Sequence, residues 1–177
     1  NRKWELDYND NKYDPTINLI EIEKKELIIE YDETSKIKDS NKKSTKDQRE
    51  KWMQEIINKV EKENIKFELH DHKGKCPHLT LFLNKDATKE EKESIMKHYA
   101  SEESKEFLDT SLCGIHLIAV PYVKHWKYGT IKELVKSGGE QIINTDDGKF
   151  NKNINNKNKE FIVKNIGGIT AKIVSRI

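Results

Sequence analysis

Cysteine is scarce in this chain, which contains only Cys76 and Cys113. A structural zinc site takes four ligands, mostly from Cys and His, so two cysteines are too few to build one by themselves. A structural disulfide is not expected either, because the reducing cytosol keeps thiols apart. The sequence therefore argues against a disulfide scaffold and predicts no structural zinc.

The sequence also lacks a signal peptide and any long apolar run. A helix that crosses a bilayer needs roughly 20 mostly apolar residues, and no segment approaches that length. The chain begins with Asn rather than Met. We therefore expect a soluble, cytoplasmic protein without a membrane partner, or a fragment of a longer protein.

An excess of one charge is missing as well. Lys and Arg number 33 against 31 Asp and Glu, for a formal net charge of +2, although 36% of the residues are charged. Any affinity for nucleic acid must then come from a local basic patch. The 177 residues, 34% of them hydrophobic and without internal repeats, suit one core and one domain over 1–177.

The pattern of apolar residues predicts an α/β domain. A helix is expected to begin near Ser44 or Thr45, and the pair Thr88 and Glu91 has the spacing of a capping box that opens a second helix. The stretch 144–159, rich in Asn, Lys and Asp, is expected to be a mobile loop. Expected strands cover 17–22, 26–32, 65–69, 78–83 and 116–120, and the first helix presents Trp52, Met53, Ile56, Ile57 and Val60 on one face.

Two acids end the strand Glu26–Asp32, which reads ELIIEYD. Residues i and i+2 of a strand share a face, so Glu30 and Asp32 project together while Tyr31 turns away. Mg²⁺ favours such hard oxygen ligands, and a third acid, Asp109, would allow a second metal about 3.5–4 Å away. The alternative is a strand that runs out into an acidic, exposed turn.

A loop with Gly74 and Lys75 leads into an almost wholly apolar strand that begins at His78. A permissive glycine, a cation and a His at the start of a strand suit a phosphate of a bound nucleotide. The plain alternative is that His78 only hydrogen-bonds a loop. The nearby triplet His70-Asp71-His72 does not predict a metal site, because no third partner accompanies it.

A basic turn follows the strand 116–120 and places Lys124, His125 and Lys127 within four residues. Lys supplies positive charge and His a directional donor, so this turn could hold a polyphosphate, unless it is simply a solvated surface. Trp126 and Tyr128 alternate with the cations and could stack on bases, although Trp126 could equally pack in the core. Further candidates for a nucleic-acid patch are Lys132 and Lys136.

Taken in order, these segments resemble the three motifs of the archaeo-eukaryotic primase superfamily, the primase–polymerases. The family's acid-x-Asp strand matches Glu30-Tyr31-Asp32, and its His at a strand start after Gly-Lys matches His78, with Cys76 in place of the usual Ser. Its third motif, a lone acid followed by R-L-I-R-x-P-G-S-x-H-x-K-T-G, is similar to Asp109 and the stretch 116–129. His116 and Ala119 depart from it, because they stand where the family commonly has Arg.

The resemblance covers roughly residues 26 to 135 and implies a mostly antiparallel, RRM-like primase–polymerase core with flanking helices. It implies a template-dependent nucleotidyltransferase that uses Mg²⁺ or Mn²⁺, nucleoside triphosphates and a single-stranded DNA template, and that works with a helicase or a large primase subunit. The metal and catalytic residues would be Glu30, Asp32 and Asp109. The nucleotide would be bound by Lys75, His78, His125 and Lys127, and the nucleic acid by Lys124, Trp126, Tyr128 and Lys132.

Two other functions are also compatible with the sequence. His78-Leu79-Thr80-Leu81 fits the H-x-T-x-apolar pattern of two-histidine phosphoesterases, although the second copy at 116–119 lacks the Ser or Thr. A noncatalytic nucleic-acid-binding domain on the same fold is the other, since acids can be lost while a fold persists. Metal dependence separates the polymerase from the hydrolase, and nucleotide binding separates it from the binding domain.

Overall fold

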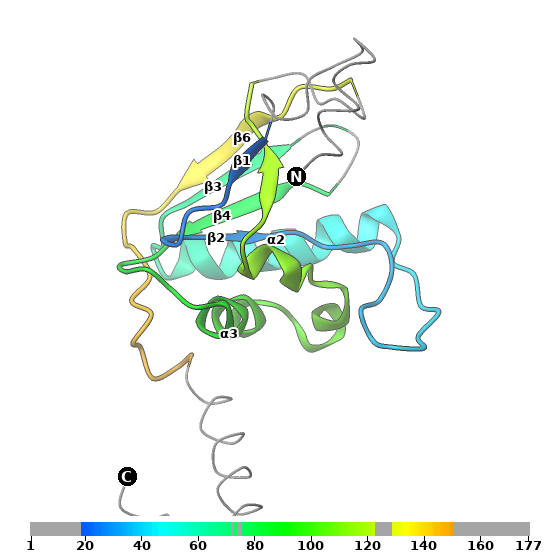
Figure 1. Cartoon of the computed structure of the whole chain (residues 1–177), viewed down its shortest axis with the longest axis horizontal. Coiled ribbons are helices and arrows are strands. Elements are labelled where there is room, and N and C mark those ends of the chain that lie inside the picture. The colour runs from blue at the N-terminus through cyan, green and yellow to red at the C-terminus, as the bar shows by residue number, and fades with distance from the viewer. Residues whose placement is uncertain (1–18, 72, 74–75, 123–128, 151–177) are drawn as a thin grey trace, which may run out of the picture.

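The computed structural model describes residues 19–71, 73, 76–122 and 129–150, and in this part the chain forms a mixed α/β fold with antiparallel sheets (Figure 1). A two-stranded sheet pairs β1 (Leu19–Glu21) with β5 (Leu117–Ala119). The larger sheet has the spatial order β2 (Glu26–Ile29), β4 (His78–Phe82), β3 (Phe67–Asp71) and β6 (Glu133–Gly138).

In the described residues, both α-helices begin as their sequences indicate. Thr45 caps α2 (Lys46–Lys62) and Thr88 caps α3 (Lys89–Tyr99), each in a complete capping box with the residue at N3. Two 3₁₀ helices follow, η1 (Glu102–Phe107) and η2 (Thr110–Cys113). In the described part of the chain, no helix combines the length and the apolar character needed to cross a membrane.

The main core lies between the sheet and the two helices, which Figure 1 shows together below the sheet. Alternate strand residues point to this core, as a half-buried sheet requires. They meet the apolar face of α2 that the sequence predicts. The strand residues in this cluster include Leu27, Ile29, Phe67, Leu79 and Leu81, and the helix residues include Trp52, Ile56, Val60, Ile95 and Tyr99.

The other face of the sheet is partly covered by the small sheet. Ile28 alternates with the core residues of β2 and packs instead with Ile22, Leu112 and Ile118 in a second, small apolar cluster. This opposite face carries the polar side chains of the strands, which therefore lie between the two sheets rather than against the helices.

An extended segment after η1 continues the larger sheet beyond β2. Tyr31 and Leu108 form an antiparallel bridge, with hydrogen bonds from Asp32 N to Phe107 O (2.8 Å) and from Asp109 N to Glu30 O (3.0 Å). The chain thus runs β2, α2, β3, β4, α3 and then this segment. In space, the segment at Leu108 lies beside β2, followed by β4 and then β3, and β6 is added beside β3. Numbered along the chain, the four extended pieces therefore lie in the order fourth, first, third, second.

Strand β6 joins β3 with a bulge. Leu134 lies opposite His70 and Lys136 lies opposite Leu69, so Val135 is an extra residue on β6. Such a bulge leaves one residue unpaired and increases the local twist.

Most of the expected strand neighbours are confirmed, and one is wrong. The strand with the paired acids lies beside the strand that begins at His78, and that strand lies beside the one predicted over 65–69. The strand expected over 116–120 does not join them in one sheet; β5 pairs with β1 instead. The reason is steric, because the segment at Leu108 already occupies the free edge of β2.

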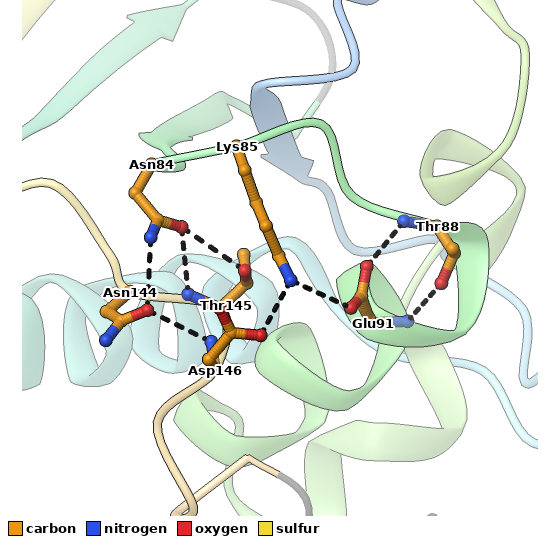
Figure 2. A network of polar contacts seen from close by, with 7 residues as sticks. All are labelled: Asn84, Lys85, Thr88, Glu91, Asn144, Thr145 and Asp146. Atoms are coloured by element: carbon orange, nitrogen blue, oxygen red, sulfur yellow. Dashed lines mark hydrogen bonds and ion pairs between the residues drawn. The ribbon is translucent and has the colours of Figure 1, made fainter.

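The stretch 144–159, expected to be a loop, is described only to residue 150. Figure 2 shows its beginning bound to the turn after β4: Thr145 donates from N and Oγ1 to Asn84 Oδ1, and Lys85 Nζ lies 2.6 Å from Asp146 Oδ1. Thr145 and Phe150 are buried. This part of the stretch is therefore packed against the domain.

The turn after β6 depends on glycine at one position. Gly139 has a φ of +66°, and a Cβ built there would lie 1.9 Å from the carbonyl oxygen of Ile65. We expect Gly139→Ala to lower the free energy of unfolding by about 2 kcal/mol or more, through backbone strain and steric overlap. Urea unfolding measures this. Gly148→Ala is the control, since its Cβ meets nothing within 4 Å; equal losses in both variants would contradict the prediction.

Candidate functional site

The three acids predicted to act together lie on two segments of backbone that pair with each other. Glu30 and Asp32 flank Tyr31, and the bridge from Tyr31 to Leu108 places Asp109 beside Glu30 through its backbone hydrogen bond. Asp109 also caps η2, because its Oδ1 accepts hydrogen bonds from Ser111 N (3.1 Å) and Ser111 Oγ (2.6 Å). The cap fixes the direction of the Asp109 side chain at the edge of the sheet.

A lysine that sequence reasoning missed lies among these acids. The ammonium of Lys36 forms an ion pair with Asp32. The hydrogen bond to Asp32 raises the pKa of Lys36, and the charges of Asp32, Asp109 and Glu30 act in the same direction. One positive charge thus lies in the field of all three carboxylates.

Glu30 is the buried member of the group. Its Oε2 lies 2.9 Å from Nε2 of His78, and the two side chains are only 3% and 6% exposed. The pairing follows from the register, because Ile29 lies opposite Leu79 and the next residues on each strand, Glu30 and His78, face each other on the same side of the sheet. His78 therefore faces a carboxylate in the interior rather than an open cleft.

A buried lysine completes this polar interior. Lys132 is 2% exposed and donates from Nζ to the carbonyl oxygen of Ala119 (3.1 Å). Burial lowers its pKa to about 8, and the charge of Glu30 opposes that shift. The expected role of Lys132 on a nucleic-acid surface does not suit this position, because the ammonium is enclosed between the sheets.

His70 is a second residue that sequence reasoning set aside. It lies opposite His78 on β3, and it is 8% exposed. Burial lowers the pKa of His70, and the nearby charge of Lys132 lowers it further. The alternation along β3 could have placed His70 on the polar face, but its neighbours depend on register, which the sequence does not reveal.

The remaining predicted residues lie outside the described part of the chain: Lys75, Lys124, His125, Trp126, Lys127 and Tyr128. The described residue at the start of the basic turn can still be placed. Tyr122 N donates to Lys132 O (2.7 Å), so the chain enters this turn beside the residue whose ammonium lies in the field of Glu30.

The donor set can be compared with the needs of a divalent cation. In the described residues, no group of three or more His, Cys, Asp or Glu side chains is arranged to hold a metal ion. The donors at this edge are nevertheless carboxylate oxygens, the ligands that Mg²⁺ and Mn²⁺ favour. The ammonium of Lys36 already serves as a cation among them. Glu30, Asp32 and Asp109 thus supply suitable donor atoms, although the described residues do not arrange them as a metal site.

The histidine pattern of the phosphoesterase alternative is not supported by strand order. The pattern at His78 lies on β4, whereas the incomplete copy at 116–119 lies on β5, which belongs to the other sheet. The sequence matches no protein-family model, and no curated protein matches it with significance.

The buried ammonium gives a test of this geometry through pH. The ordinary pKa of Lys is 10.5, so between about pH 8 and that value the unfolded chain binds more protons at Lys132 than the folded chain. The contribution of Lys132 to the free energy of unfolding must then rise with pH in this window. We expect the free energy of unfolding of the wild type to increase relative to Lys132→Met from pH 8 upward, as measured by urea unfolding.

The matched control is Lys136→Met, which also removes one positive charge, from a partly exposed residue on β6. A constant difference between the wild type and Lys132→Met across the window would contradict a desolvated ammonium at Lys132.

Proposed function

We propose that this protein is a metal-dependent, template-dependent nucleotidyltransferase of the primase–polymerase type. One observation carries the proposal: the Tyr31 to Leu108 bridge gathers Glu30, Asp32 and Asp109 at one edge of the sheet. The sequence resemblance names these same three acids. They come from two distant parts of the chain, so their meeting is a property of the fold and not of sequence spacing.

The order of the extended pieces supports an RRM-like core. A chain of the form β-α-β-β-α-β, with its four extended pieces in the order fourth, first, third, second, is the ferredoxin-like arrangement that RRM folds share. The described chain follows this order if the segment at Leu108 counts as the fourth piece. Strand β6 is an addition beside β3.

The residues divide into three roles in this proposal. Glu30, Asp32 and Asp109 would hold Mg²⁺ or Mn²⁺, which when bound neutralises charge on the transferring phosphoryl group and lowers the pKa of the attacking 3′-hydroxyl. Lys75, His125 and Lys127 are proposed to hold the triphosphate, and the buried His78, expected from the sequence to join them, would act on the nucleotide through Glu30, which it positions by its 2.9 Å contact. Lys124, Trp126 and Tyr128 are proposed to bind the single-stranded DNA template.

This activity also suggests a protein partner and a cellular location. Synthesis on a single-stranded template calls for a partner that opens the duplex or presents the strand, so we propose a helicase or a large primase subunit as the partner. An intracellular location belongs to the same proposal.

The acids are the most direct test. We expect Asp32→Ala and Glu30→Ala to abolish nucleotide incorporation, a loss of at least about a hundredfold, because charge stabilisation in the transition state is lost. Extension of a labelled primer with Mg²⁺ or Mn²⁺ measures it. Glu33→Ala removes the adjacent exposed acid, whose partner is the surface residue Lys43, and should keep activity.

Circular dichroism and urea unfolding must show that each variant is folded. Extension at near wild-type rate by a folded Asp32→Ala protein would refute the assignment of Asp32 as a metal ligand.

Substitutions of the two histidines should have different effects on metal binding and nucleotide binding. We expect His125→Ala to weaken binding of a nucleoside triphosphate about ten- to a hundredfold and to leave Mn²⁺ affinity unchanged, because only a phosphate contact is lost. His78→Ala should weaken the binding of both Mn²⁺ and the triphosphate, since Glu30 loses a neighbour that orients it. Isothermal titration with Mn²⁺ and then with a non-hydrolysable triphosphate measures each term. Unchanged nucleotide affinity in both variants would show that these histidines are structural.

One observation favours a second candidate, a noncatalytic nucleic-acid-binding domain. The acids already have internal counter-charges, since Lys36 pairs with Asp32 and Lys132 lies in the field of Glu30. A protein that kept its fold without its chemistry could retain such neutralised acids. Binding of single-stranded DNA without any Asp32-dependent binding of Mn²⁺ would favour this candidate.

A further inference from the structure

The loop after β2 holds Lys36 in a defined place beside the acids. The bridge between Thr34 and Lys43 closes this loop, and Ser35 N donates to Lys42 O (3.1 Å). The backbone of Lys36 is itself bound, because its N–H donates to the carbonyl oxygen of Glu106 (2.6 Å). The loop is therefore a folded element and not a free tether.

Glu106 fixes the loop to the same part of the chain that carries Asp109. Its carboxylate accepts hydrogen bonds from Ser35 Oγ (2.7 Å) and from Lys42 Nζ (3.0 Å). Glu106 belongs to η1, which leads directly into the segment at Leu108 and Asp109. The base of the Lys36 side chain and the third acid are thus held by one local structure.

The Lys36 side chain itself is partly open to solvent. It is 50% exposed, and Asp32, its ion-pair partner, is 26% exposed. A lysine side chain has four rotatable bonds and a strongly hydrated ammonium, so a partly exposed ion pair of this kind contributes little and exchanges partners readily. Hydrogen bonds hold the backbone of Lys36, whereas only a partly exposed ion pair holds its ammonium.

We propose that Lys36 is an exchangeable counter-cation of the carboxylate site: its ammonium neutralises Asp32 until a divalent cation takes that place, and it then binds a phosphate of the incoming nucleoside triphosphate. Three acids at one edge repel one another when no cation lies among them, and Lys36 supplies that cation in the free protein. Once a divalent metal compensates the acids, the ammonium is released beside the polyphosphate that the metal attracts.

This inference rests on the proposed function, because it needs the acids to bind metal. It assigns to a loop residue a role that the motifs of the sequence do not contain. Lys36 is a positioning residue in the free state and a substrate contact in the bound state. The two roles predict effects of opposite sign for one substitution, which a merely structural role would not produce.

The test measures Mn²⁺ binding and nucleotide binding separately in Lys36→Met, using the full chain. Without the competing ammonium, Mn²⁺ affinity should increase roughly two- to tenfold, as judged by titration calorimetry or by the loss of the free Mn²⁺ signal in electron paramagnetic resonance. With saturating Mn²⁺, affinity for a non-hydrolysable nucleoside triphosphate should decrease about tenfold.

Two further variants complete the design. Lys38→Met removes an exposed lysine from the same loop and should change neither affinity. Lys36→Arg keeps the charge and should restore most of the nucleotide affinity. A Lys36→Met protein with unchanged or weaker Mn²⁺ binding, or with unchanged nucleotide binding, overturns the inference.

The failure of the inference differs from the failure of the proposed function. If Asp32→Ala abolishes Mn²⁺ binding while Lys36→Met leaves both affinities unchanged, the metal site stands and the role of Lys36 is wrong. If the wild type binds Mn²⁺ no better than Asp32→Ala, the proposed function is wrong, and the inference about Lys36 is wrong as well.

Discussion

The pairing of the chain at Tyr31 with the chain at Leu108 is the contact on which the site depends. It fills the free edge of β2 and brings Asp109 to Glu30. Aromatic packing supports it: the Tyr31 ring lies 5.5 Å from that of Trp52, and the Tyr31 hydroxyl is 2.9 Å from Ser104 Oγ in η1. The same side chain thus joins the strand of the acids, the long helix and the segment that brings the third acid.

The second constraint is the cost of burying charge. A carboxylate taken out of water is strongly destabilised unless a partner compensates it, and Glu30 is 3% exposed. His78 and the charge of Lys132 supply that compensation from β4 and from the residue before β6. Stability alone does not explain such a cluster, since apolar side chains would fill the same space at lower cost. A polar interior of this kind is typical of functional sites.

The sequence predicts the parts of the fold that local patterns determine. The helix caps at Thr45 and Thr88 and the shared face of Glu30 and Asp32 all follow from spacing of a few residues. The pairing partner of β5 does not follow from local spacing, because the sequence of a short apolar strand does not indicate which sheet edge it will join. The contacts of Lys132 could not be predicted either, because they depend on cross-strand register, which is set by the whole sheet.

The bulge at Val135 decides on which side of the sheet Lys132 falls. Side chains alternate along a strand, so one inserted residue reverses the parity of everything before it. With Val135 as the extra residue, Leu134 lies opposite His70, and Lys132, two positions earlier, shares that polar face. In a regular ladder continued from Lys136, the alternation would instead direct Lys132 to the side of the apolar helices. A single unpaired residue on an outer strand thus determines whether the polar interior contains its ammonium at all.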